Sequence, residues 1–209
     1  MDGHEQALAY AQANFAAVND SFVQRLRQTF AAFDSGKVLD LGCGPADIPV
    51  RLCRVLGGVR VWAVDASEAM LLHARGVVDG AGLGDRIMLV RAHCPAHVPP
   101  GDFDAVMSNS ILHHLPDPHV LWQQIKDSAA PGAAIFIQDL MRPNSQAQAQ
   151  EIVDTYAAGE PEILRHDFYH SLLAAFTPQE VRQQLVAHDL SHLTVEAISD
   201  RHLLVYGHL

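Results

Sequence analysis

The stretch Lys37–Asp47, K-V-L-D-L-G-C-G-P-A-D, decides how the rest of this chain is interpreted. It opens with a short apolar run, typical of a buried strand, that Asp40 interrupts near its end. Gly42 and Gly44 follow, and since neither has a Cβ they permit a tight turn and close approach of the backbone to a ligand. Apolar residues then recur at helical spacing, at Ile48, Leu52, Val55 and Leu56. The stretch therefore predicts strand, glycine turn and helix, the first unit of a nucleotide-binding α/β fold.

Asp40 makes the class of ligand more specific. A dinucleotide site presents backbone N–H groups to a pyrophosphate, which a fixed carboxylate would repel. A carboxylate would instead hold an ammonium group. Asp47 also stands where the dinucleotide pattern has its third glycine. The residues predict a ligand with an amino-acid end, and a nicotinamide or flavin enzyme remains as a rival class.

The motif V-L-D-L-G-C-G resembles the first motif of the class I S-adenosylmethionine-dependent methyltransferases. The resemblance continues in V-W-A-V-D-A-S, F-D-A-V-M-S-N-S-I-L-H-H-L-P-D-P and P-G-A-A-I-F-I-Q-D-L. It covers about Lys37 to Leu140, and the order of the motifs is more specific than any one of them. It implies in-line methyl transfer from S-adenosyl-L-methionine to an oxygen, nitrogen, sulfur or carbon atom, with S-adenosyl-L-homocysteine as the product. A non-catalytic S-adenosylmethionine-binding module or partner subunit is the second hypothesis.

Size and net charge limit the classes of molecule that could accept the methyl group. The 209 residues fit one domain, residues 1–209. Twenty-four acidic against fourteen basic side chains give a formal net charge of −10. This disfavours nucleic acid, including tRNA, because neutralising phosphates requires Lys and Arg. We therefore expect a small-molecule acceptor, ahead of a tRNA or protein substrate.

The location of the protein is also predicted from sequence. No apolar run approaches the ~18 residues of a membrane helix, so no membrane partner is expected. The start, M-D-G-H-E-Q, lacks the basic flank and apolar core of an export signal. Cys43, Cys53 and Cys94 are an odd number and widely spaced, which indicates free thiols in a reducing cytoplasm.

The motif order predicts a three-layer, doubly wound α/β fold. Its seven-stranded sheet has the order 3-2-1-4-5-7-6, with strand 7 antiparallel. After the first strand we expect strands at Val59–Val64, Ile87–Arg91, Phe103–Ser108, Ala133–Gln138, His192–Ser199 and His202–Gly207. Residues 1–33 are expected as two helices, Glu5–Val18 and Ser21–Phe33. A helix from Pro116 to about Ala129 and a turn at Pro131-Gly132 should precede the fifth strand.

Asp65 ends the second strand, twenty-three residues after Gly42. This is about the distance at which a βαβ unit brings an acid to the ribose hydroxyls. The resemblance adds Tyr10 closing over the cofactor and Met70 lying either near the adenine or in the core. His93 stands where the family often has an acid. The complete expected cofactor set is Tyr10, Asp40, Gly42, Cys43, Gly44, Asp65, Ala66, Met70, His93, Cys94, Asn109 and His114.

A metal is not expected. His93, Cys94 and His97 lie in a Pro-rich loop, and the sequence has no second cluster that would complete a ligand set.

Residues 141–177 form a helical insertion after the fifth strand, with helices at Ser145–Ala158 and from Pro161. It is expected either as a lid over the acceptor or as the surface of a homodimer. Tyr156, His166 and His170 are the candidate substrate-binding residues. A hydroxyl or ammonium acceptor would also need a base, for which the catalytic candidates are His113, Asp139 and Tyr169. The sequence does not decide which of His113 and His114 faces the cofactor.

Overall fold

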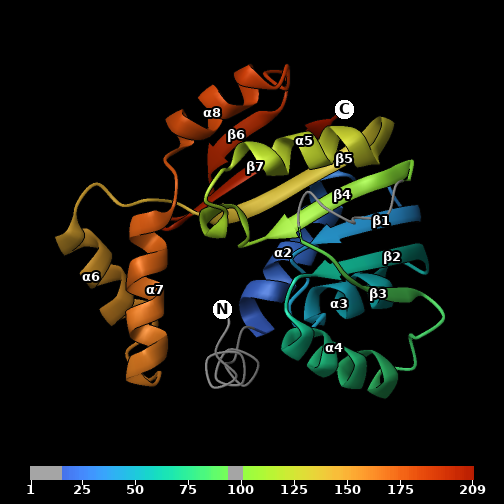
Figure 1. Cartoon of the computed structure of the whole chain (residues 1–209), viewed down its shortest axis with the longest axis horizontal. Coiled ribbons are helices and arrows are strands. Elements are labelled where there is room, and N and C mark those ends of the chain that lie inside the picture. The colour runs from blue at the N-terminus through green and yellow to red at the C-terminus, as the bar shows by residue number, and fades with distance from the viewer. Residues whose placement is uncertain (1–15, 94–100) are drawn as a thin grey trace.

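The protein is built on one seven-stranded sheet with the order β3-β2-β1-β4-β5-β7-β6 (Figure 1). The computed structural model describes residues 16–93 and 101–209. The strands are β1 Ser35–Leu41, β2 Gly58–Asp65, β3 Ile87–Arg91, β4 Phe103–Asn109, β5 Ala129–Leu140, β6 Thr194–Ala197 and β7 His202–His208. Strands β1 to β5 are parallel, and β7 pairs antiparallel with both β5 and β6. The predicted fold class and strand order are confirmed.

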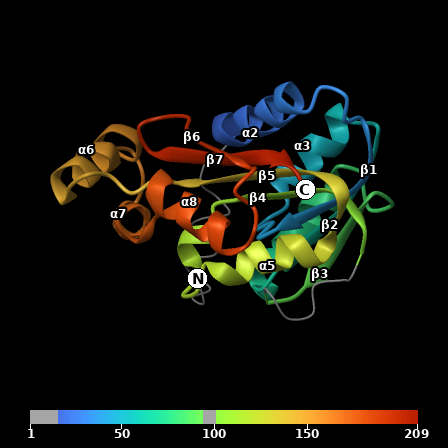
Figure 2. The same cartoon turned by 90° about the horizontal axis from the view of Figure 1, so that it is seen from above.

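Helices cover both faces of the sheet. They are α2 Ala16–Thr29, α3 Asp47–Val55, α4 Glu68–Gly80, η1 Leu112–His114, α5 His119–Ser128, α6 Gln146–Tyr156, α7 Glu162–Ala174 and α8 Pro178–Ala187. One apolar core joins the sheet to α2, α3 and α4, and a second joins it to α5 and α8. Figure 2 shows α2 and α3 on one side of the sheet and α5 and α8 on the other. In the described ranges, no helix combines the length and apolar character needed to cross a membrane.

The apolar run of β1 serves both cores. Val38 packs into the core under α2 and α3, whereas Leu39 and Leu41 pack into the core under α5 and α8. This follows from the alternation of side chains along a strand. A central parallel strand is covered on both faces, which explains why its sequence is almost continuously apolar.

The predicted break in the N-terminal helical region at Asn19–Ser21 is wrong, because α2 runs through it without interruption. Asn19 Nδ2 donates to Asp47 Oδ2 at 2.8 Å, and Asp20 is ion-paired with Arg51. These polar side chains therefore contact α3 and do not interrupt the helix. The helix also ends at Thr29, short of the predicted Phe33. The expected helix Glu5–Val18 lies mostly outside the described residues.

The predicted turn at Pro131-Gly132 is also wrong, since both residues lie inside β5. The register shifts there: Phe103 pairs with Ala129, but Ala105 pairs with Ala134. Gly132 has a φ of 81°, and its N–H donates to the Leu209 carbonyl at 2.8 Å. The additional residues between Ala129 and Ala134 therefore form an irregularity within β5, where glycine permits the unusual backbone conformation.

The insertion is helical, as predicted, and forms a unit with its own small core. The core combines side chains of α6 and α7 with the end of β5: Leu140, Ala149, Ile152, Val153, Ala157, Leu172 and Ala175. Figure 1 shows α6 and α7 projecting beyond the carboxyl ends of the strands.

Two sets of contacts fix this unit to the domain. At its stem, Arg142 N donates to the Phe176 carbonyl at 3.2 Å, and the Arg142 guanidinium is ion-paired with Glu180. At its far side, the Tyr156 hydroxyl donates to Asp200 Oδ2 at 2.9 Å. The Arg201 guanidinium lies 3.3 Å above the centre of the Tyr156 ring. The insertion is thus held both to α8 and to the β6–β7 turn.

The capping box at Thr177 should stabilise the junction between the insertion and α8. Thr177 Oγ1 accepts from Glu180 N at 3.2 Å, and Glu180 Oε2 accepts from Thr177 N at 2.8 Å. Thr177→Ala removes the side-chain acceptor, so we expect it to lower the free energy of unfolding by about 1 kcal/mol in urea denaturation. Thr177→Ser keeps the oxygen and serves as the control. Equal losses in both variants would contradict a capping role.

Candidate functional site

The glycine turn after β1 is bonded to the end of β2. The N–H groups of Gly42 and Cys43 both donate to the Val64 carbonyl at 2.9 Å. Gly42 has a φ of 78°, and a Cβ there would lie 3.0 Å from the Ile111 side chain, so a larger residue would strain the backbone and require Ile111 to shift. Gly44 has a φ of 53°, and apart from its chain neighbours no atom of residues 16–93 and 101–209 lies within 4 Å of where its Cβ would be. The backbone at Gly44 is therefore open to a ligand.

Asp65 is held at the centre of this arrangement. Its Oδ2 accepts from Gly44 N at 2.8 Å, and its Oδ1 accepts from Ser67 N at 2.8 Å. A carboxylate oxygen has room for a second donor, so each oxygen can still accept a hydroxyl. The residues present thus fit a ribose with two adjacent hydroxyl groups.

Asp40 lies beneath the same turn and is only 2% exposed. Burial and the neighbouring carboxylate of Asp65 raise the pKa of Asp40 to about 8. Burial and both carboxylates also raise the pKa of the Cys43 thiol, which makes it a poor nucleophile. A cation brought to this place would relieve the repulsion between the two carboxylates, and the ammonium of an amino-acid group has the required charge.

Other expected cofactor residues are distributed around this centre. Ala66 follows Asp65 and is half-buried, whereas Met70 is only 3% exposed, which favours its core alternative. Asn109 Oδ1 accepts from Gln138 Nε2 at 3.2 Å at the end of β4. His93 is exposed two residues after β3. The predicted contacts of Tyr10 and Cys94 lie outside the described residues.

His113 and Asp139 form a buried pair where η1 meets the end of β5. His113 Nδ1 lies 2.5 Å from Asp139 Oδ1. Asp139 also accepts from Leu112 N at 2.7 Å and from Leu140 N at 2.8 Å. Asp139 is also only 1% exposed, which argues against it as a base that contacts an acceptor. The sequence placed these two residues in one region but did not show that they are paired.

His114 has a different environment. It is exposed on one side, and its ring centre lies 4.0 Å from that of His113. Partial loss of solvent and the neighbouring His113 lower the pKa of His114 to about 4, although Asp139 and Asp167 act in the opposite direction. His114 is therefore neutral at neutral pH. Helix α7 of the insertion packs against η1 here.

The candidate residues of the insertion do not form one cluster. Tyr169 and His166 line a hollow of about 500 Å³ between α6 and α7. The ring centres of His166 and His170 are 4.3 Å apart, and those of Tyr169 and His170 are 5.4 Å apart. Tyr156 lies away from these three, bonded to the β6–β7 turn. No sequence signal marks that contact, because its partners are forty-four residues apart.

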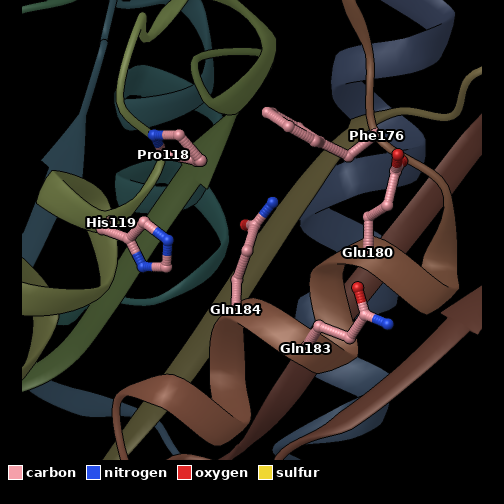
Figure 3. A pocket seen from close by; sticks show the side chains of 6 residues that line it. All are labelled: Pro118, His119, Phe176, Glu180, Gln183 and Gln184. Atoms are coloured by element: carbon pink, nitrogen blue, oxygen red, sulfur yellow. The ribbon is translucent and has the colours of Figure 1, made fainter.

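A second hollow, of about 320 Å³, lies between α5 and α8. Figure 3 shows its lining: Pro118, His119, Phe176, Glu180, Gln183 and Gln184. None of the predicted site residues is among them. Glu180 is already bonded to Arg142 and Thr177, and Gln184 Oε1 accepts from Trp122 Nε1 at 2.9 Å. These polar groups therefore serve the packing of the helices.

Comparison with known proteins agrees with this geometry. A family model described as a methyltransferase domain matches residues 38–132. The chain is 44% identical over 73 residues to the release factor glutamine methyltransferase of Gloeobacter violaceus, covering 35% of this chain and 26% of that protein. It is 34% identical over 120 residues to the ubiquinone biosynthesis O-methyltransferase of Thiobacillus denitrificans, covering 56% of this chain and 51% of that protein. The chain thus spans about a quarter and about half of these curated relatives.

The fold has a close structural counterpart. A solved structure of a putative S-adenosyl-L-methionine-dependent methyltransferase from Methanococcus maripaludis superposes with a TM-score of 0.74 at 19% identity. The match covers 97% of this chain and 91% of that one. Sheet order and helix placement define the class I, Rossmann-like methyltransferase fold. The matched model of a methyltransferase domain, residues 38–132, lies within that fold.

The buried Asp40 carboxyl makes stability depend on pH. Its pKa is about 8 in the folded protein and about 3.8 in an unconstrained chain. Between these values the folded state holds a proton that the unfolded state has lost, so the free energy of unfolding should fall as pH rises. The slope is at most about 1.4 kcal/mol per pH unit. Asp40→Asn cannot titrate, so its stability relative to wild type should increase over that range in urea denaturation.

The exposed Asp85 provides the control for this prediction. Asp85→Asn should leave the pH dependence of stability unchanged. An effect of Asp40→Asn that is the same at every pH would contradict the raised pKa of Asp40.

Proposed function

We propose that this protein is a methyltransferase that transfers the methyl group of S-adenosyl-L-methionine to a small-molecule acceptor. The observation that carries the proposal is the Asp65 carboxylate, fixed by Gly44 N and Ser67 N at the carboxyl ends of β1 and β2. Parallel α/β sheets bind nucleotides at this edge. The matched methyltransferase domain includes these residues.

The ribose and the amino-acid end of the cofactor each have a matching group in the protein. Asp65 can accept hydrogen bonds from the ribose hydroxyls, and the open backbone at Gly44 can lie against the ligand. Asp40 pairs with the ammonium group once the approach of that cation lowers its raised pKa and the carboxyl loses its proton. When bound, S-adenosyl-L-methionine supplies an electrophilic methyl group on a sulfonium sulfur. The main task of the protein is then to align the acceptor with that methyl group and to exclude water.

A small-molecule acceptor fits the charge and the shape of the chain. A formal net charge of −10 is unfavourable for binding nucleic acid. The helical insertion stands beyond the carboxyl ends of the strands (Figure 1), where it borders the acceptor side of the site. The name of the O-methyltransferase relative supports oxygen as the accepting atom.

Removal of the Asp65 side chain tests the cofactor site. Asp65→Ala deletes the acceptors for two hydroxyl groups, so we expect it to weaken S-adenosyl-L-homocysteine binding by roughly 2–4 kcal/mol, about 30- to 1,000-fold. Isothermal titration calorimetry measures the change. The exposed Asp85→Ala is the matched control and should bind like wild type. Wild-type affinity in Asp65→Ala would overturn the assignment.

The reaction is tested by incubating the protein with methyl-labelled S-adenosyl-L-methionine and fractionated cell extract. Label in the small-molecule fraction supports the proposal. Label confined to the protein or RNA fraction would replace the small-molecule acceptor with a macromolecule. Binding without any transfer would instead support a non-catalytic binding module.

The insertion is proposed as a lid over the acceptor. The residues proposed to bind the cofactor lie at the ends of β1 and β2, whereas Tyr169 and His170 lie on α7. Substitutions in α7 should therefore affect the acceptor and not the cofactor. Tyr169→Phe and His170→Ala should change turnover of the labelled acceptor, with S-adenosyl-L-homocysteine affinity within about twofold of wild type. Hydrogen exchange over residues 145–176 should slow when both ligands are present. Full turnover in both variants and ligand-independent exchange would identify the insertion as structural.

A further inference from the structure

We propose that Tyr156 is a positioning residue, and that with Asp200 and Arg201 it forms a clasp that opens and closes. The clasp holds the helical insertion in one position, and its release lets the insertion pivot about its stem and admit the acceptor. The part of this inference that concerns the acceptor rests on the proposed function, whereas the clasp itself is tested without cofactor or acceptor.

The clasp is a closed set of three contacts. The Tyr156 hydroxyl donates to Asp200 Oδ2 at 2.9 Å, and Arg201 Nη1 donates to Asp200 Oδ1 at 2.9 Å. The Arg201 guanidinium also lies 3.3 Å from the centre of the Tyr156 ring. Asp200 therefore bridges the hydroxyl and the guanidinium, while the guanidinium covers the ring. Each residue contacts both of the others, so the removal of any one of them leaves a single contact.

The two sides of the clasp are each folded by their own interactions. On one side, the insertion has an apolar core formed by α6, α7 and the end of β5. On the other side, Ser199 Oγ accepts from Arg201 N at 3.2 Å and from His202 N at 3.0 Å, which fixes the β6–β7 turn. Both sides therefore keep their structure when the clasp opens, and the insertion moves as one body.

The clasp lies at the surface, so it opens at low cost. Tyr156 is 48% exposed, and the side chain of Asp200 is 45% exposed. Water replaces an exposed hydrogen bond or ion pair with little loss of free energy, and an exposed cation–π contact is also weak. A buried apolar contact at this place would be harder to release. These contacts thus define one position of the insertion without fixing it irreversibly.

The stem of the insertion supplies the pivot. Met141 and Phe176 form a β-bridge, Arg142 N donates to the Phe176 carbonyl at 3.2 Å, and Met141 N donates to the Arg201 carbonyl at 2.8 Å. These are backbone contacts, so they persist when the side chains of the clasp separate. Helix α7 packs against η1, which in turn packs against β5. Rotation about the stem therefore changes the gap between α7 and η1, beside the strand ends.

The position of the insertion is measured first, as the distance between two spin labels determined by double electron–electron resonance. The labels are attached at Glu151→Cys on α6 and Leu72→Cys on α4, both of which are exposed. Cys43 and Cys53 are buried, and Cys94→Ser removes the third thiol. With the clasp intact, this protein should give one dominant distance.

Breaking the clasp should add a second distance. Tyr156→Ala and Arg201→Ala should each raise the population of that distance at least about threefold, and their combination should add little, because both break the same clasp. Tyr156→Phe keeps the ring under the guanidinium and should give an intermediate population. Thr155→Ala is the matched control on α6, since the Thr155 hydroxyl donates within the helix, to the carbonyl of residue 151. Unchanged distances in Tyr156→Ala and Arg201→Ala would overturn the inference.

The second measurement is methyl transfer from labelled S-adenosyl-L-methionine at increasing amounts of the small-molecule fraction of cell extract. A protein that is less often in the closed position binds the acceptor more weakly in proportion. Tyr156→Ala should therefore raise the half-saturating amount of the fraction at least about threefold. The maximal rate should stay within about twofold of wild type, because bound acceptor restores the closed position. A lower maximal rate with an unchanged half-saturating amount would indicate a purely structural role and overturn the inference.

Controls separate this inference from the proposed function. S-adenosyl-L-homocysteine affinity should stay within about twofold of wild type in Tyr156→Ala, because Gly44 and Asp65 lie at the ends of β1 and β2. If wild type binds S-adenosyl-L-methionine but labels nothing, the proposed function fails, while the spin-label distances still support or overturn the clasp. If wild type labels small molecules and Tyr156→Ala matches it in both measurements, only the clasp fails.

Discussion

The site depends on one carboxylate that joins two strand ends. Asp65 closes β2, and by accepting from Gly44 N and Ser67 N it fixes both the glycine turn after β1 and the start of α4. The turn is also bonded to β2 through the Val64 carbonyl. Because parallel strands end at the same edge, these hydrogen bonds bring the ends of β1 and β2 together where α/β folds bind nucleotides.

Much of the fold was predictable from sequence because its signals are local. The apolar run of β1 and the paired glycines each lie within a few residues, and each formed as expected. The errors arose where distant residues altered a local preference. Asn19 and Asp20 were expected to interrupt the N-terminal helix, but α3 supplies partners for them and α2 runs through both residues. The glycine of Pro131-Gly132 indicated a turn, but pairing with the chain end keeps the segment in β5.

The candidate site was predictable in part, for the same physical reason. Residues that follow strand ends, such as Asp65 and Asp139, can be assigned to the ligand edge from the strand pattern alone. The partners of these residues cannot be assigned in this way. The pairing of His113 with Asp139 spans twenty-six residues and depends on how η1 packs against β5. The position of Tyr156 was the least predictable, because it depends on a turn between two strands at the opposite edge of the sheet.

The attachment of the helical insertion has a consequence for how such a protein can diversify. Its stem is fastened to α8 through Arg142 and Glu180, and its far side to the β6–β7 turn through Tyr156. These contacts lie beside β5, β6 and β7, whereas the residues proposed to bind the cofactor lie at the ends of β1 and β2. The contacts that hold the insertion are thus separate from those that fix the Asp65 turn. If the proposed sites are correct, substitutions in the insertion can change acceptor preference while the Asp65 turn keeps its hydrogen bonds.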